Sequence, residues 1–207
     1  MGEHERTVAL KFDEIQIKSK IEYRGGKLYG LAENREDELA HHIQAFMIKS
    51  ISSNYSEMVR LTPVTRNNSD FLTPEITSVI DDLELVGFKV VALTSDNASI
   101  NRNSFENICL PNETYFLSKN HKDARIYTFL DAPHMIKPIR NNWINCIDKK
   151  FYCPKFDNPN EICVADFNLI IKLYEFEKSK LLELASGLTY APVYPTSIEK
   201  QKVYFAL

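Results

Sequence analysis

Three aspartates in this sequence stand where strand-like runs end, and carboxylates in such positions can hold a metal ion. Asp13 lies where the apolar positions of a β-rich run change face, and Asp96 and Asp131 follow apolar runs. In an open sheet whose neighbouring strands end at one edge, such side chains converge, and a cation must offset their repulsion. Magnesium suits this position because it prefers oxygen ligands and supports phosphoryl transfer. For each aspartate alone, a turn or helix cap is the commoner role.

A second group of polar residues follows Asp131 at the predicted start of a helix, where backbone donors favour phosphate. Its members are His134, Lys137, Arg140, Asn141, Asn142 and Trp143. The alternative is a solvated basic helix face with Trp143 in the core. Two other features indicate no site: the His41 and His42 pair has no Cys or carboxylate at metal-ligand spacing, and no GxxxxGK[ST] motif occurs.

The elements that must position these residues form an α/β pattern. Residues 7–17 predict a strand and Gly25-Gly26 a tight hairpin, while residues 43–51 and 58–64 are compatible with strand or short helix. Thr73 and Pro74 predict a helix start, and Gly87 predicts its end. Continuous apolar runs at 88–93 and 126–130 are typical of strands buried on both faces. Pro133 begins another predicted helix, residues 151–161 predict a linker or long loop, and residues 164–185 predict a further helix.

Composition narrows the class of protein. The chain has 207 residues, 44% hydrophobic and 26% charged, and a net charge of −3, which disfavours a generally basic nucleic-acid coat. Its apolar stretches are shorter than the roughly 20 residues of a membrane-spanning helix, and no apolar signal core is found near the N-terminus. Without a secretory signal, the four cysteines predict reduced thiols in a cytosolic or nuclear protein.

Several segments together resemble the P-element transposase family, which includes the THAP-type transposases and their domesticated relatives. The segments are FDEI at 12–15 with the following Gly-containing hairpin, LTSDNASINR at 93–102, LDAPHMIKPIRNNW at 130–143 and PTSIEKQKV at 195–203. The third is the most specific, because the pattern DxPHxxKxIRNN is rare by chance.

The resemblance implies an RNase H-like fold: a mixed sheet, with an antiparallel meander followed by parallel strands, flanked by helices and followed by a C-terminal helical segment. It implies residues 1–150 as an incomplete RNase H-like domain and 151–207 as a linker and the start of a helical GTP-binding insertion. It also implies magnesium-dependent DNA cleavage and strand transfer in the nucleus, with transposon ends and target DNA as partners, self-association as a further possibility, and no membrane partner.

By motif match, Asp13 and Asp96 are the expected catalytic metal ligands of a two-magnesium site. Asp131, His134, Lys137, Arg140 and Asn141 are the expected supporting residues near DNA. The family's third carboxylate and most GTP contacts are expected beyond Leu207, and no THAP zinc pattern precedes residue 7. The expectation is therefore a truncated copy, a partial gene model or a domesticated remnant.

Three readings of the function stay open. The first is a transposase fragment that cleaves DNA poorly by itself because the third carboxylate is missing. The second is a catalytically inactive, domesticated DNA- or protein-binding module. The third is a self-contained nuclease in which Asp166, Glu175 or Glu177 supplies that carboxylate. In the first reading the helix at 164–185 packs loosely, leaving Leu169, Leu173 and Leu181 partly exposed.

Overall fold

The computed structural model describes residues 2, 4–35, 37–121, 124–180, 182 and 184–201. They belong to two compact units, an N-terminal unit (Met1–Asp131) and a C-terminal unit (Ala132–Leu207). The sequence places the domain boundary later, at residue 150, and that boundary stays a prediction. In the described part of the chain, no helix has the length and apolar character needed to cross a bilayer.

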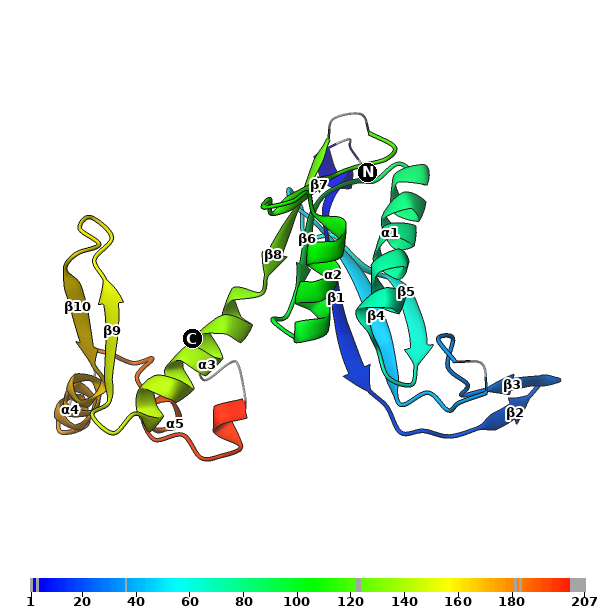
Figure 1. Cartoon of the computed structure of the whole chain (residues 1–207). Helices are drawn as coiled ribbons and strands as arrows, with labels where there is room; N and C mark the ends of the chain where they lie inside the picture. Colours follow the sequence, from blue (N-terminus) through cyan, green and yellow to red (C-terminus); the bar gives the residue numbers. More distant parts are fainter. Residues whose placement is uncertain are drawn as a thin grey trace. The chain divides into compact units, whose positions relative to one another are not determined.

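The N-terminal unit is built on a six-stranded mixed sheet (Figure 1). Its elements are η1 (His4–Arg6), β1 (Thr7–Gln16), β2 (Glu22–Arg24), β3 (Lys27–Tyr29), β4 (His42–Ser50), β5 (Ser56–Val64), α1 (Ser69–Leu85), β6 (Lys89–Ser95), α2 (Ser99–Ile108), β7 (Tyr115–Leu117) and β8 (Arg125–Leu130). The strand order is β5-β4-β1-β6-β8-β7, with β2 and β3 as a separate hairpin. β1 pairs with β6 in parallel, as β6 does with β8, and the other pairs are antiparallel. The predicted mixed RNase H-like sheet is confirmed, and the two ambiguous segments are strands β4 and β5.

Helices α1 and α2 cover one face of this sheet. Val8, Leu10 and Phe12 alternate along β1 and are almost fully buried, as the period of two in the sequence predicts. Phe12 packs against Phe46 of β4 and Phe105 of α2, with ring centroids 5.8 and 5.9 Å apart. From Asp13 onward β1 is exposed. The central strand is therefore held by the core up to the residue before the first candidate ligand.

Helix α1 begins earlier than the sequence predicts. The expected start at Thr73 and Pro74 is wrong, since the helix begins at Ser69 and contains Pro74. The physical reason is a better cap upstream: the Asn68 side chain accepts a hydrogen bond of 2.8 Å from the Phe71 amide. The predicted end is confirmed, because Gly87, with φ of 90°, follows the cap residue Val86.

The C-terminal unit contains a helix, a hairpin and shorter helices. Its elements are α3 (Ala132–Asn145), β9 (Lys150–Pro154), β10 (Ile162–Asp166), α4 (Phe167–Lys178), α5 (Tyr190–Val193) and η2 (Glu199–Gln201). The predicted loop at 151–161 is partly wrong, because β9 and β10 form an antiparallel ladder around a shorter turn.

The helix predicted at 164–185 is shorter in the structure. The Asp166 carboxylate caps its start by accepting from the Asn168 amide at 2.9 Å, and Ser179 ends it by donating to the Phe176 carbonyl. The predicted exposure of Leu169 and Leu173 is confirmed at 62% and 47%. The prediction for Leu181 lies outside the described residues.

Candidate active site

Asp13 and Asp96 lie at one level of two adjacent parallel strands. β1 and β6 pair as far as Lys11 opposite Thr94, and each aspartate stands two residues beyond that pair. Successive residues of a strand alternate between its faces, so Asp13 in β1 lies on the face that carries Lys11, opposite the buried face, and Asp96 directly follows the end of β6. The shared edge predicted from sequence therefore has a structural basis in the β1–β6 register. The close approach of the two carboxylates stays a prediction.

Both carboxylates have local hydrogen bonds that use one oxygen. Asp13 Oδ1 accepts from the Glu14 amide at 2.8 Å, and Asp13 is exposed. Asp96 Oδ1 accepts from the Ala98 amide at 3.0 Å and from Asn101 Nδ2 at 2.6 Å, at the entry to α2. Asp96 thus has the turn role that is common after a strand, and this role orients its side chain.

Asp131 stands at the same level on the next strand. β6 and β8 pair as far as Ser95 opposite Leu130, and the Asp131 amide then donates to the Ser95 carbonyl at 2.7 Å. Its carboxylate is 16% exposed and accepts from Lys11 Nζ at 3.2 Å. Because Lys11 offsets its charge, Asp131 differs electrostatically from Asp13 and Asp96.

Lys11 is the residue that sequence reasoning missed. It lies two positions before Asp13, on the same face of β1, and this spacing was a usable signal. Its partner is 120 positions away, so only the strand order β1-β6-β8 brings the two together. We define Asp13, Asp96, Asp131 and Lys11 as the carboxylate edge.

The carboxylate edge fits a divalent cation by its donor chemistry. Mg²⁺ in phosphoryl-transfer sites is commonly held by one or two carboxylates, with water and substrate phosphate completing its coordination. The second oxygens of Asp13 and Asp96 have no hydrogen bond among the described residues. No group of three His, Cys, Asp or Glu side chains in that same part of the chain is arranged to hold a metal. Among the described residues, the edge therefore offers a metal the carboxylates of Asp13 and Asp96, while the carboxylate of Asp131 is paired with Lys11.

The predicted supporting residues on α3 belong to the C-terminal unit. His134, Lys137 and Asn141 are half-buried, and Asn141 Nδ2 donates to the Lys200 carbonyl at 2.9 Å. Arg140 is only 7% exposed, and burial lowers the pKa of its guanidinium. Nearby, Trp143 Nε1 donates to the Lys149 carbonyl at 2.8 Å. These contacts hold α3 within its own unit, and a role of α3 toward DNA stays a prediction.

The residues proposed as substitutes for a third carboxylate are engaged locally in the C-terminal unit. Asp166 caps α4, and Glu175 Oε1 accepts from the Tyr194 hydroxyl at 3.0 Å. Glu177 Oε2 accepts from the Leu184 and Ala185 amides at 2.6 and 3.0 Å. Each has a structural role that accounts for its position.

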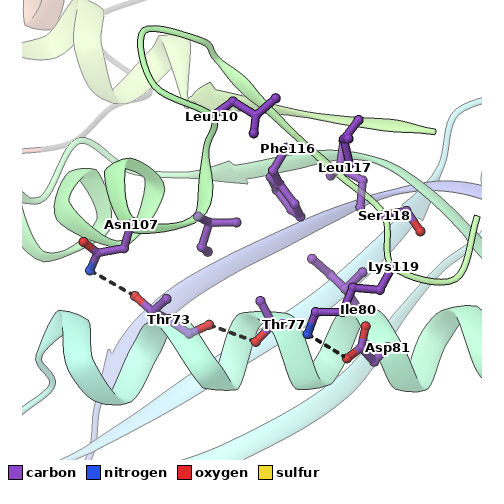
Figure 2. A pocket seen from close by; sticks show the side chains of 12 residues that line it. Thr73, Thr77, Ile80, Asp81, Asn107, Leu110, Phe116, Leu117, Ser118 and Lys119 are labelled. Atoms are coloured by element: carbon purple, nitrogen blue, oxygen red, sulfur yellow. Dashed lines mark hydrogen bonds and ion pairs between the residues drawn. The ribbon is translucent and has the colours of Figure 1, made fainter. Parts of the chain in front are cut away.

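A pocket of about 380 Å³ lies between α1, α2 and β7, away from the carboxylate edge (Figure 2). Ile80, Phe116 and Ile126 contribute apolar lining, and Lys119 at the rim pairs with Asp81 at 3.4 Å. The described lining is mostly apolar, with this ion pair and a few hydroxyl and amide groups. It offers no arrangement for phosphoryl transfer.

Comparison with known proteins agrees with the fold. The TNP-like, RNase H N-terminal domain family matches residues 1–108, half of the chain. The transposable element P transposase of Drosophila melanogaster is 23% identical over 144 residues, which are 68% of this chain and 18% of that protein. The solved Drosophila P element transposase strand transfer complex matches 99% of this chain and 42% of its own, with a TM-score of 0.74 and 20% identity. The chain thus spans less than half the length of these relatives, and it belongs to the TNP-like RNase H family as a P-element transposase-related segment.

Proposed function

We propose that this chain is the metal-binding part of a DNA transposase, and that Asp13 and Asp96 are its first two metal ligands. The observation that carries the proposal is that each aspartate stands two residues beyond the last β1–β6 pair, Lys11 with Thr94, and has one oxygen that its local hydrogen bonds do not use. The substrate is the phosphodiester of DNA, by relation to the P transposase and to the strand transfer complex. Magnesium bound there would activate the attacking oxygen and stabilise the leaving oxygen.

Asp13, Asp96 and Lys11 have different roles at the proposed metal site. Asp96, fixed by the Ala98 amide and by Asn101, provides an oriented ligand at the β6 end, while Asp13 provides an exposed one from β1. Lys11 pairs with Asp131 and so reduces the negative charge that the DNA backbone must approach. In hydrolysis the oxygen of a water bonds to phosphorus while the bond from phosphorus to the 3′ oxygen breaks, and the 3′ oxygen takes up a proton and leaves as a hydroxyl. In strand transfer that hydroxyl loses its proton and bonds to the phosphorus of a second phosphodiester, whose own 3′ oxygen leaves as a hydroxyl.

The wider family properties are part of the same proposal. We infer nuclear action, with transposon ends and target DNA as the substrates. Self-association and GTP binding by a following insertion are also inferred, and a THAP zinc module is inferred as the family's element for recognising DNA ends. Their support is the P-element resemblance of the segments around Asp13, Asp96 and Asp131.

Metal binding is the direct test, because it can be measured without any cleavage of DNA. We expect weak Mg²⁺ or Mn²⁺ binding by calorimetry, and paramagnetic broadening by Mn²⁺ of resonances near Asp13 and Asp96. Asp13→Asn and Asp96→Asn should each weaken it at least about tenfold, since each removes a ligand. Asp157→Asn, at an exposed position in the C-terminal unit, is the matched control.

The outcomes separate the open readings. Unchanged binding in both variants would overturn the metal site. DNA binding without metal binding would favour the inactive binding module. Robust cleavage by this chain that Asp96→Asn abolishes would favour a self-contained nuclease.

A further inference from the structure

The hairpin that follows β1 concentrates positive charge in an otherwise acidic chain. Residues 18–29, which we call the hairpin arm, contain four basic residues and one acidic residue, whereas the whole chain has a net charge of −3. The basic residues are Lys18, Lys20, Arg24 and Lys27. All six residues of β2 and β3 are exposed. The arm therefore presents a local basic surface to solvent.

The two faces of the arm differ in chemistry. Cross-strand pairing places Arg24 opposite Lys27 and Glu22 opposite Tyr29 on one face, with a shallow hollow lined by these residues and Gly25. Tyr29 on this face is 53% exposed. Two directly opposed cations destabilise an antiparallel pair. An anionic ligand would offset that repulsion.

In the described part of the chain, Arg24 and Lys27 also have no carboxylate partner. Among the described ion pairs, the one within the arm joins Lys20 to Glu22 at 3.9 Å and leaves both cations out. A pair of unpaired cations beside an exposed aromatic ring is the chemistry that binds a nucleic-acid backbone, with phosphates on the cations and a base or sugar on the ring.

The arm is tied to the sheet at its base. Gly30, with φ of 103°, brings the chain so close to the Lys20 carbonyl that a Cβ would lie 2.0 Å from its oxygen. The Gly30 carbonyl then accepts from the Ala40 amide at 2.9 Å, and Leu31 bridges to Leu39. The hairpin is thus anchored, although a two-stranded ribbon alone is marginally stable.

The arm leaves the sheet at the end where β1 stops (Figure 1). Arg24, on the face that carries Lys27 and Tyr29, is eleven residues from Asp13, so their Cα atoms are at most about 40 Å apart. Two turns of duplex DNA, roughly 20 base pairs, are about 68 Å long. A single DNA segment can therefore contact the arm while it lies at the carboxylate edge.

We propose that the Arg24, Lys27 and Tyr29 face of the hairpin arm binds the DNA backbone beside the site of cleavage. The choice of DNA as the polyanion rests on the proposed function. The arm then binds the DNA and positions it, while Asp13 and Asp96 hold the metal at the scissile phosphate.

The test measures metal-free binding of the whole chain to a fluorescent duplex of about 20 base pairs and to its single strand, by anisotropy in EDTA. Arg24→Glu with Lys27→Glu should weaken duplex binding about fivefold or more at low salt. It should also reduce the slope of log K against log salt by about 1 to 2, since each lost phosphate contact contributes about 0.9. Tyr29→Ala should weaken single-strand binding more than duplex binding, and Tyr29→Phe should restore it.

The matched control is Lys49→Glu with Lys89→Glu, which makes the same change in net charge at exposed positions near the opposite end of β1. Affinity within twofold of wild type in this control supports the proposal. Equal losses in both double variants, or no loss in the arm variant, would overturn it. Displacement of the duplex by polyglutamate at equal charge concentration would overturn it in favour of an acidic protein partner.

The result is separable from the metal proposal. Asp13→Asn with Asp96→Asn should leave DNA binding in EDTA intact, and the arm variant should leave Mn²⁺ binding intact. Both proposals would be supported by two results together: loss of Mn²⁺ binding in the Asp13→Asn with Asp96→Asn variant, and weaker duplex binding in the Arg24→Glu with Lys27→Glu variant. Unchanged metal binding in the aspartate variant would overturn the metal site and leave the arm supported.

Discussion

The two units of this chain bury apolar surface very differently. In the N-terminal unit the sheet and helices α1 and α2 share one continuous core, in which Leu10, Phe12 and Leu72 are at most 1% exposed. Among the described residues of the C-terminal unit, the buried apolar side chains are Phe167, Tyr174 and Val193. The candidate chemistry thus stands on the better packed unit, where rigid strands can hold ligand geometry.

Exposed apolar side chains make the contrast sharper. Ile147 and Phe156 are fully exposed, and Leu169, Leu173 and Phe176 are 47% to 62% exposed. Apolar surface of this kind commonly marks an interface with another protein segment. The C-terminal unit therefore has exposed apolar side chains of a kind common at interfaces, and its assignment as the start of an insertion domain stays a prediction.

The largest expected effect is a difference in the free energy of unfolding between two leucine-to-alanine substitutions, one in each unit. Leu10→Ala should lower the free energy of unfolding by about 2–5 kcal/mol, because it opens a cavity in the sheet core. Leu169→Ala removes the same atoms from a side chain that is 62% exposed. It should therefore change the free energy of unfolding by about 0.5 kcal/mol or less. Urea denaturation followed by circular dichroism measures both.

Equal effects of the two leucine substitutions would contradict the comparison, since Leu169 would then be buried in solution. If Leu10→Ala fails to fold, Leu10→Val provides a milder version with an expected loss of about 1 kcal/mol.

The second effect would strengthen the less packed unit. Cys153 and Cys163 are directly opposite in the β9–β10 ladder, and antiparallel partners have Cα spacings that suit a disulfide. Oxidation with diamide should join them and stabilise the hairpin by about 2–3 kcal/mol, because it closes a short loop in the unfolded chain. Peptide mapping without reductant identifies the bond, and hydrogen exchange of β9 and β10 measures the gain.

Cys163→Ser is the control for this bond, and Cys109 and Cys146 should stay outside it. A bond between other cysteines, with Cys153 and Cys163 still reduced, would show that the ladder register differs in solution.

The smallest expected effect is a change in the titration of Asp148, which lies just before β9. The pKa of Asp148 is lowered from 3.8 because its carboxylate accepts from the Lys150 amide at 3.1 Å and from the Tyr152 hydroxyl. Since the folded pKa is depressed, this stabilisation is present above the unfolded pKa and is lost as pH falls through the folded pKa. The Lys150 amide resonance should titrate with a midpoint below 3.8.

Tyr152→Phe should move that midpoint upward, because it removes one donor to the charged carboxylate. A midpoint at or above 3.8 in the unmodified chain would mean that Asp148 is solvated.

Elements with a local sequence signal were predicted, whereas the β9–β10 hairpin was not. The Gly25-Gly26 turn, the end of α1 before Gly87 and the strands preceding Asp96 and Asp131 were predicted, because each depends on local conformation or a short apolar pattern. The hairpin of β9 and β10 was missed. Its stability comes from pairs such as Tyr152 with Val164, which no local signal in a Pro- and Asn-rich segment reveals.

The sequence by itself determined which residues have chemistry and which local elements carry them: three aspartates at or near the ends of strand-like runs, an α/β order of elements and a hairpin at Gly25-Gly26. Only the tertiary structure decided how those elements combine. The order β1-β6-β8 places Asp13, Asp96 and Asp131 at one level and pairs Lys11 with Asp131 across 120 positions. The physical reason is that side-chain periodicity is a property of a few neighbouring residues, whereas strand order and register depend on packing between distant segments.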